Sequence, residues 1–192
     1  MNIVIFGPPG AGKGTQSKFI VKKFNLYQLS TGDLLRNEIK NQTELGKKIS
    51  LIMNKGDLVS DDIVSSLIEK FISNKIYKNK IIFDGYPRNL NQAKNLDILL
   101  KKHDQKIDIV LKLSVSLETI KKRILERKNL ENRIDDNEKV AVKRFEMYEE
   151  NIKPVIEYYR KSNLLRLVNG EGSITKINNQ ISDLIEGIKG WL

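Results

Sequence analysis

The sequence contains no cysteine and only one histidine among its 192 residues. Without cysteine the chain cannot form a disulfide or a thiolate metal site, so zinc centres built on cysteine are excluded. No stretch approaches the roughly 20 consecutive apolar residues that a transmembrane helix needs. The first residues include a short apolar run, but they lack the basic flank and cleavage site of a secretory signal. We therefore expect a cytoplasmic protein that does not associate with membranes.

The chain also has few features that would divide it into separate domains. It contains four prolines, and no internal repeat, low-complexity tract or linker-like change in composition interrupts it. A chain of this length suits one α/β domain with one core. We therefore expect residues 1–192 to form a single domain.

Acidic residues are in the minority. There are 24 Asp and Glu residues against 34 Lys and Arg residues, which gives a formal net charge of +10. Such a charge suits a nucleic acid or an anionic small molecule as partner. Most of the excess is lysine, dispersed in doublets such as Lys22-Lys23 and Lys101-Lys102, a pattern typical of solvated helix faces. We expect a monomer that binds anionic small molecules and no nucleic acid.

Short apolar runs alternate along the chain with amphipathic helical patterns. The helical spacing is clearest over residues 63–72, behind a Ser60-Asp61 cap, and over residues 174–188, behind Ser173 and before Gly190. Such alternation predicts right-handed crossovers and a parallel sheet with helices on both faces. Ligands of such sheets bind beyond the carboxyl ends of the strands. The five expected strands are residues 3–6, 27–30, 80–83, 109–113 and 164–168.

The loop after the first expected strand reads GPPGAGKGT, residues 7–15. It fits the phosphate-loop pattern G-x-x-x-x-G-K, which usually continues with Ser or Thr, whereas here Gly14 follows Lys13 and the hydroxyl comes one residue later at Thr15. The loop lies between a strand and a helix, so its backbone N–H groups and the helix N-terminus can bind phosphate. Lys13 would add a full positive charge among the phosphate oxygens.

Polar residues also follow two other expected strands. Asp84 comes directly after the apolar run 81–83 and is typical of a carboxylate that holds Mg²⁺ through water. Gly85 and Pro87 would fix the backbone so that Arg88 points into the cleft; the alternative is a turn with a surface arginine. The stretch STGDLLR, residues 30–36, can cap a helix without binding anything.

Four arginines follow the fourth expected strand. Arg123 and Arg127 are four residues apart on a helix capped by Ser116, so they share a face, where like charges repel unless an anion lies between them. Arg133 and Arg144 follow. Because lysine is the usual cation of this chain, arginine at these positions indicates bidentate phosphate contacts. The alternative is that the arginines lie on solvated helix faces.

Taken together, these stretches resemble the adenylate kinases, a family of nucleoside monophosphate kinases, over essentially the whole chain. The stretches that carry the resemblance are GPPGAGKGTQ (7–16), LSTGDLLR (29–36), GDLVSDD (56–62), IIFDGYPRNLNQA (81–93) and NRIDDN (132–137). In this family the loop is G-x-P-G-x-G-K-G-T, so Gly14 and Thr15 are the expected pair.

The resemblance implies a fold and a lid form. It implies a P-loop NTPase-type core with a five-stranded parallel sheet, a helical AMP-binding segment at about residues 30–59 and a short lid at about residues 126–136. Long forms carry an inserted lid domain, sometimes with zinc bound by cysteines. Here only a short loop, residues 128–132, separates Arg127 from Arg133, so the chain resembles the short form.

The implied reaction is ATP + AMP ⇌ 2 ADP, with Mg²⁺ accompanying ATP, no zinc and no general base. The alternative within the class is a UMP/CMP kinase. Thr31 and Gln92 favour adenine, since pyrimidine relatives tend to carry Ala and Asn at these positions. Nucleotide motors and GTPases do not fit, because they need a hydroxyl at position 14, where this chain has Gly14. A basic nucleic-acid-binding P-loop protein would need an arginine or aromatic stripe away from the loop, and none is evident.

The resemblance also implies roles for individual residues. The catalytic residues are Lys13, Arg88, Arg123, Arg133 and Arg144, and Asp84 supports hydrated Mg²⁺. The residues implied for ATP are Gly10, Ala11, Gly12, Lys13, Gly14, Thr15, Arg123, Arg127 and Gly172. The residues implied for AMP are Thr31, Arg36, Asp57, Leu58, Val59, Gly85, Tyr86, Pro87, Arg88, Gln92, Arg133 and Arg144.

Overall fold

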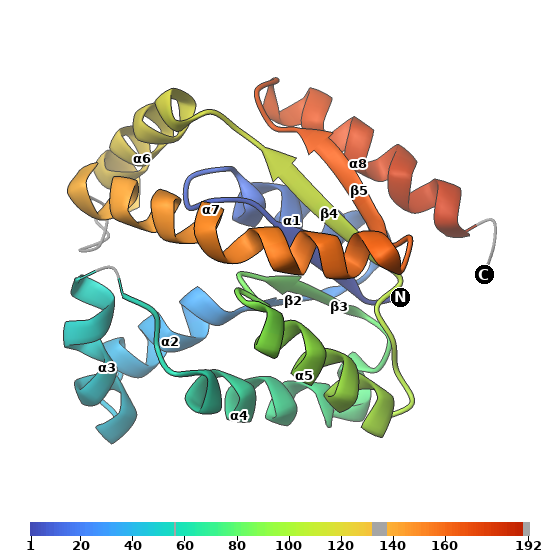
Figure 1. Cartoon of the computed structure of the whole chain (residues 1–192), viewed down its shortest axis with the longest axis horizontal. Coiled ribbons are helices and arrows are strands. Elements are labelled where there is room, and N and C mark those ends of the chain that lie inside the picture. The colour runs from blue at the N-terminus through green and yellow to red at the C-terminus, as the bar shows by residue number, and fades with distance from the viewer. Residues whose placement is uncertain (56, 132–137, 190–192) are drawn as a thin grey trace.

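Five parallel strands form the centre of the molecule (Figure 1). The computed structural model describes residues 1–55, 57–131 and 138–189. The strands run in the order β2-β3-β1-β4-β5, which places the first strand in the middle of the sheet. Both the α/β class and the five-stranded parallel sheet are confirmed. The strands are β1 (Ile3–Phe6), β2 (Tyr27–Ser30), β3 (Ile81–Asp84), β4 (Ile109–Ser114) and β5 (Leu165–Asn169).

The central strand β1 is apolar at every position because both faces of the sheet are covered. Ile3 and Ile5 pack into one core, and Val4 and Phe6 pack into the other. All four residues are at most 3 % exposed. The first core includes residues of α1 (Lys13–Phe24) and α8 (Ile174–Lys189), and the second includes residues of α5 (Leu90–Lys102) and α7 (Glu138–Lys161).

The remaining helices lie mostly toward one end of the molecule. Helix α2 (Thr31–Lys40) packs on α3 (Glu44–Asn54), with α4 (Asp61–Ile72) and the short 3₁₀ helix η1 (Lys75–Tyr77) following. Figure 1 shows α3 and α6 (Leu117–Glu131) at the same end, on opposite sides of the start of α7. The carboxyl ends of β2 and β4 lead into α2 and α6, and those of β1, β3 and β5 lead into α1, α5 and α8. In a parallel sheet all these strand ends lie at the same edge, where ligands bind.

Three local expectations need correction. Strand β3 ends at Asp84, so this aspartate belongs to the strand and pairs with Ser30 of β2. Residues 128–131 continue helix α6, because lysine, leucine and glutamate, three of these four residues, are good helix formers and no Gly or Pro interrupts them. The Ser60 side chain makes no capping hydrogen bond; Asp61 and Asp62 instead lie at the positive end of the α4 dipole.

Two other predicted helix caps are confirmed. The Ser173 hydroxyl accepts a hydrogen bond from the backbone N–H of Lys176 at 3.3 Å, and the Ser116 hydroxyl accepts one from Thr119 at 3.2 Å. These caps fix the loops that precede α8 and α6. Among the helices of the described ranges, none combines the length and the apolar character that crossing a membrane requires.

Candidate functional site

A cavity of about 920 Å³ opens where the strands end. Its volume lies near the upper end of the roughly 300–1,000 Å³ typical of small-molecule sites. Among the described residues, seven cationic side chains line it against four carboxylates, which makes it a site for polyanions. The lining cations are Lys13, Lys18, Arg36, Arg88, Arg123, Arg127 and Arg144, and the carboxylates are Asp33, Asp57, Asp84 and Glu126.

The glycine loop forms one wall of this cavity. Gly10 and Gly12 adopt φ angles of 84° and 93°, which side chains rarely tolerate, and Ala11 N–H donates to Pro8 O at 3.0 Å to close the turn. A side chain on Gly10 would also meet Ile124 of α6 at 3.0 Å. Helix α1 begins directly after Gly12, which has no side chain to cap it, so its first N–H groups can bind an anion.

Lys13 is folded back onto the loop. Its ammonium donates to Gly7 O at 2.7 Å and to Pro8 O at 3.0 Å. The pKa of Lys13 is lowered to about 8, chiefly by burial; Asp84 opposes this shift, and the nearby Arg88 and Arg127 add to it. A bound phosphate would replace the carbonyl partners with a stronger, charged one.

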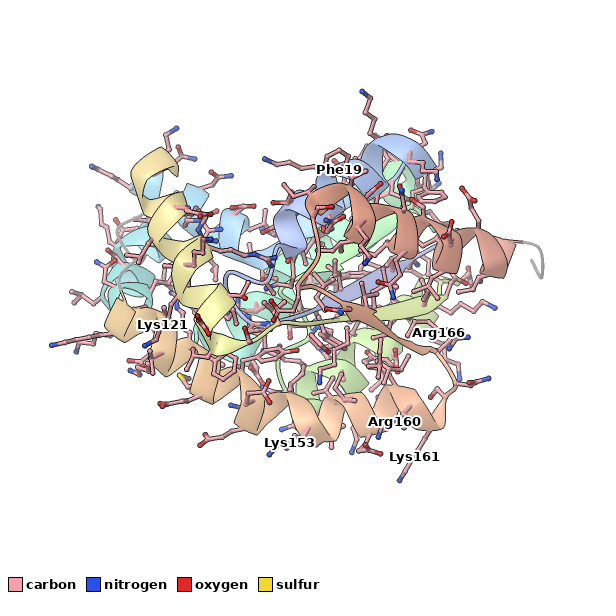
Figure 2. All side chains as sticks on the ribbon, turned by 90° about the horizontal axis from the view of Figure 1, so that it is seen from above. Phe19, Lys121, Lys153, Arg160, Lys161 and Arg166 are labelled. Atoms are coloured by element: carbon pink, nitrogen blue, oxygen red, sulfur yellow. The ribbon has the colours of Figure 1, made fainter. Side chains whose placement is uncertain are left out.

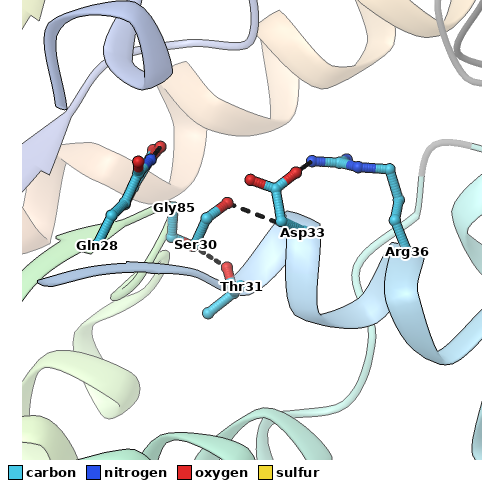
Figure 3. A network of polar contacts seen from close by, with 7 residues as sticks. Gln28, Ser30, Thr31, Asp33, Arg36 and Gly85 are labelled. Carbon is cyan, nitrogen blue, oxygen red and sulfur yellow. Dashed lines mark hydrogen bonds and ion pairs between the residues drawn. The ribbon is translucent and has the colours of Figure 1, made fainter. Parts of the chain in front are cut away.

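Asp84 lies at the end of β3 and is 7 % exposed. Its Oδ2 accepts a hydrogen bond from Gln28 Nε2 at 2.9 Å; Figure 3 shows Gln28 beside Gly85, the residue that follows the aspartate. Within the described ranges, no group of three or more His, Cys, Asp or Glu residues is placed so that it could hold a metal ion. A single buried carboxylate beside a phosphate loop fits Mg²⁺, which keeps several waters and takes its other ligands from phosphates.

Two further arginines lie on the β2 and β3 side of the cavity. Arg88 Nε donates to Gly85 O at 2.7 Å. Thr31 Oγ1 donates to the same oxygen at 2.9 Å, and Figure 3 shows Thr31 beside Gly85. Burial and the neighbouring Arg144 lower the pKa of Arg88 to about 10, so it stays cationic at neutral pH. Arg36 pairs with Asp33 at 2.5 Å, as Figure 3 also shows. The expected Asp84–Arg88 turn is therefore part of the cavity wall, not a surface turn.

The arginines of α6 and α7 reach the cavity from the other side. Arg123 donates to Ala11 O at 3.2 Å and to Gly170 O at 2.8 Å, and Arg144 donates to Met53 O at 3.2 Å. Arg127 also lines the cavity. Figure 2 shows a contrast, because Lys153, Arg160 and Lys161 point outward from α7. Arg133 lies outside the described residues.

Three residues implied for AMP are buried and do not line the cavity. Thr31, Tyr86 and Gln92 are at most 3 % exposed and are not among the lining residues. The side-chain amide of Gln92 donates to Asp61 Oδ1 at 2.6 Å and accepts from the backbone N–H of Arg88 at 2.7 Å. These internal partners take one of the two N–H groups and one of the two oxygen lone pairs of the amide. The other described residues implied for AMP line the cavity: Arg36, Asp57, Leu58, Val59, Gly85, Pro87, Arg88 and Arg144.

The loop between β5 and α8 forms the opposite end of the cavity. Gly172 and Ile174 line it, and Ile174 O accepts a hydrogen bond from Gln16 Nε2 at 3.1 Å. The carboxylate of Glu171 accepts from Thr119 Oγ1 at 2.7 Å, which holds this loop against the start of α6. All the residues implied for ATP, from Gly10 to Thr15 with Arg123, Arg127 and Gly172, therefore line one region.

Sequence reasoning missed two glutamines of the site. Gln28 lies two residues before Ser30 on β2, and both line the cavity. Because side chains alternate along a strand, the position of Ser30 could have predicted that of Gln28. Gln16 lies on the first turn of α1 and contacts a residue 158 positions away. No local pattern indicates a contact of that kind.

The sequence was compared with known proteins. The sequence model of the family described as adenylate kinase matches residues 5–164. The chain is 41 % identical to the adenylate kinase of Pelagibacter ubique (strain HTCC1062), over 97 % of this chain and 100 % of that one. It is 40 % identical to the adenylate kinase of Flavobacterium psychrophilum, over 98 % and 100 % of the two chains. It is 43 % identical to the adenylate kinase of Prochlorococcus marinus, over 95 % and 97 %.

Proposed function

The chain belongs to the adenylate kinase family and is an ATP:AMP phosphotransferase, and we propose that both nucleotides bind in the cavity at the strand ends. The observation that carries the proposal is the pairing of two phosphate-binding groups in one cavity. The glycine loop with Lys13 forms one group. Arg36, Arg88 and Arg144, which line the same cavity, form the other. The names of the relatives favour adenylate kinase over the UMP/CMP kinase alternative.

ATP is assigned to the glycine-loop side. The N–H groups of residues 10–15 and the α1 N-terminus would hold the β- and γ-phosphates, with Lys13 and the arginines of α6 adding charge. The loop at Gly172 would lie beside the base. Because Arg123 already contacts both Ala11 O and Gly170 O, it links the phosphate end of this half to the base end.

AMP is assigned to the side of α2, α3 and the Gly85–Arg88 turn. Arg36, Arg88 and Arg144 would bind the AMP phosphate, and the segment 57–59 would cover the nucleotide. Gln92 is assigned to the adenine, because an amide can donate to and accept from an adenine edge. Arg133, which the sequence places among the catalytic arginines, is assigned to the phosphates that meet between the two halves.

Phosphoryl transfer in such a site needs little covalent chemistry from the protein. The AMP phosphate is already ionised, so no general base is required, and catalysis consists of positioning two polyanions in line and stabilising the charge on the moving phosphoryl group. When bound with ATP, Mg²⁺ would neutralise phosphate charge, and Asp84 would hold its water ligands. Asp84→Asn should raise the Mg²⁺ concentration needed for half-maximal rate, and EDTA should abolish turnover.

We also infer that the chain acts as a cytoplasmic monomer without a nucleic-acid partner. The absence of cysteine is consistent with a reducing compartment. The outward lysines and arginine of α7 lie apart from the cavity and suit solubility (Figure 2). Sedimentation analysis and an oligonucleotide-binding titration at low salt would test these two points.

Equilibrium binding of each nucleotide alone tests the assignment of the two halves. Lys13→Met should weaken ATP binding at least tenfold and leave AMP binding nearly unchanged, whereas Arg36→Met should do the reverse, because each loses one charge-assisted contact to phosphate. Lys22→Met, an exposed change on α1, is the control and should affect neither. Equal losses for both nucleotides in either cavity variant would contradict two separate sites.

A further inference from the structure

The buried amide of Gln92 is held between two fixed partners. Its Nε2 donates to Asp61 Oδ1 at 2.6 Å, and its Oε1 accepts from the backbone N–H of Arg88 at 2.7 Å. Asp61 is the first residue of α4, and Gln92 lies in the first turn of α5. The contact therefore joins the start of one helix to the start of another, 31 residues apart along the chain.

The chemistry of these partners leaves one orientation of the amide. A carboxylate can only accept hydrogen bonds, and a backbone N–H can only donate them. The nitrogen of the amide must therefore face Asp61, and the oxygen must face Arg88. Rotation of the amide by 180° would place Oε1 against the carboxylate and Nε2 against the N–H of Arg88, and both contacts would repel.

The carboxylate of Asp61 is itself fixed. Asn89 Nδ2 donates to its two oxygens at 3.2 and 3.0 Å, and Asn89 Oδ1 caps α5 by accepting from the backbone N–H of Gln92 at 2.8 Å. Asn89 thus connects the carboxylate and the glutamine through a second route. The side chain of Gln92 is 3 % exposed, so water cannot readily replace the lost bonds if the amide rotates.

The two bonds to Asp61 and Arg88 leave one N–H and one oxygen lone pair of the amide for a further partner. Adenine complements this pair, because its amino group donates and its ring nitrogen accepts. A 6-oxopurine such as hypoxanthine or guanine has the opposite pattern, since O6 accepts and N1–H donates. An amide that could rotate would serve either base, but a fixed amide serves only adenine.

We propose that Asp61 is a specificity-determining residue, which holds the Gln92 amide in the orientation that selects AMP against 6-oxopurine nucleoside monophosphates. The proposal rests on the assignment of Gln92 to the AMP base made above. Asp61 acts through Gln92 and Arg88 and contacts no substrate in this scheme. Its contribution is therefore to selectivity between bases, and the phosphoryl transfer itself does not use it.

The test compares kcat/KM for AMP and IMP, with ATP as donor, in the wild type, Asp61→Asn and Asp62→Asn. Asparagine has nearly the same volume, but it can turn an N–H toward a rotated Gln92, so the IMP/AMP ratio should rise on the order of tenfold, as expected for one hydrogen bond to a charged group. Asp62 is the neighbouring, exposed acid, and Asp62→Asn should leave the ratio within about twofold.

The ratio is measured on one preparation, so a loss of folded enzyme cancels. Asp61→Ser, whose hydroxyl can donate or accept, is a second variant that should raise the ratio in the same direction. Binding of AMP and IMP without ATP should show the same change. A ratio that stays within twofold in both Asp61 variants while AMP turnover falls would make the residue purely structural. A wild type that does not phosphorylate AMP would overturn the proposed function and this inference together.

Discussion

Five of the seven described cations that line the cavity have oxygen partners within the protein. Lys13, Arg88, Arg123 and Arg144 all donate to backbone carbonyls, and Arg36 pairs with an aspartate. Burying an unpaired charge is costly, so these bonds keep the protein stable when the cavity holds no phosphate. Phosphates offer charged acceptors, so under the assignment proposed above nucleotide binding would exchange the carbonyl and carboxylate partners of these cations for phosphate oxygens.

Arg123 should not be replaceable by lysine. Its two terminal nitrogens reach different carbonyls, Ala11 O and Gly170 O, which a single ammonium cannot do in the same geometry. We expect Arg123→Lys to lower kcat by about 10² or more, the usual effect of losing one preorganised donor. The control is Lys122→Ala, an exposed change on the same helix, which should alter kcat by less than about threefold. Near-normal kcat in Arg123→Lys would contradict the phosphate assignment.

Lys13 should give ATP binding a pH dependence. Because its pKa is lowered to about 8 in the free protein, the ammonium is present below that pH and is lost above it. ATP favours the charged form, so the affinity measured by calorimetry should fall about tenfold per pH unit between roughly pH 8 and 9. Lys13→Arg keeps its charge in this range, so its ATP affinity should not fall in this way. An equal fall in affinity in both proteins would mean that a group other than Lys13 titrates.

The lowered pKa of Lys13 also makes the free energy of unfolding depend on pH, in a direction that can be predicted. The folded protein binds fewer protons at Lys13 than the unfolded chain does between about pH 8 and the ordinary value of 10.5. The contribution of Lys13 to the free energy of unfolding should therefore increase with pH across this window. Denaturant unfolding at pH 8 and pH 10 should show this slope as a difference between the wild type and Lys13→Met, and identical slopes would argue against the lowered pKa.

At the scale of elements, the loops that follow the strands were the most predictable part of the site. Each follows a short apolar run, and in a parallel sheet the carboxyl ends meet at one edge, so the glycine loop and Asp84 could be expected to lie together. The bonds of Gln92 with Asp61 and of Thr31 with Gly85 were not predictable. They join residues 31 and 54 positions apart, and they depend on how α4 and α5 pack and how β2 meets β3.

Helices α2 and α3 pack too closely for any side chain at Gly46. A Cβ there would lie 2.1 Å from Glu38 O and 2.4 Å from Glu38 C, both backbone atoms. Gly46→Ala should therefore lower the free energy of unfolding by about 1–3 kcal/mol despite the better helix propensity of alanine. Because α3 leads into the residues assigned to AMP, the KM for AMP should rise more than the KM for ATP.

Gly187 is the matched control for this substitution. It lies exposed in α8, and a Cβ there would meet nothing within 4 Å among the described residues. Gly187→Ala should raise the free energy of unfolding by about 0.5–1 kcal/mol and leave both KM values unchanged. Thermal and denaturant melts of the two variants would check the pair, and a Gly46→Ala protein as stable as the wild type would contradict the close packing.

At the scale of the whole molecule, the cavity concentrates charge that the sequence shows only as an overall excess of +10. The cationic side chains gather around one opening, while lysines such as Lys153 and Lys161 point into solvent (Figure 2). Composition alone could not separate these two groups. The parallel sheet, with its glycine loop on one side and Arg88 on the other, determines which of the cations face each other.

The most direct test of this account is the kcat/KM of the wild type for AMP, CMP and UMP, with ATP as donor in the presence of Mg²⁺. We predict that one ATP and one AMP yield two ADP, and that kcat/KM for AMP exceeds the values for CMP and UMP by at least about 10², as in sites that hydrogen-bond the base. Comparable values for the three monophosphates, or the absence of ADP formation from AMP, would contradict a cavity that holds ATP and AMP together.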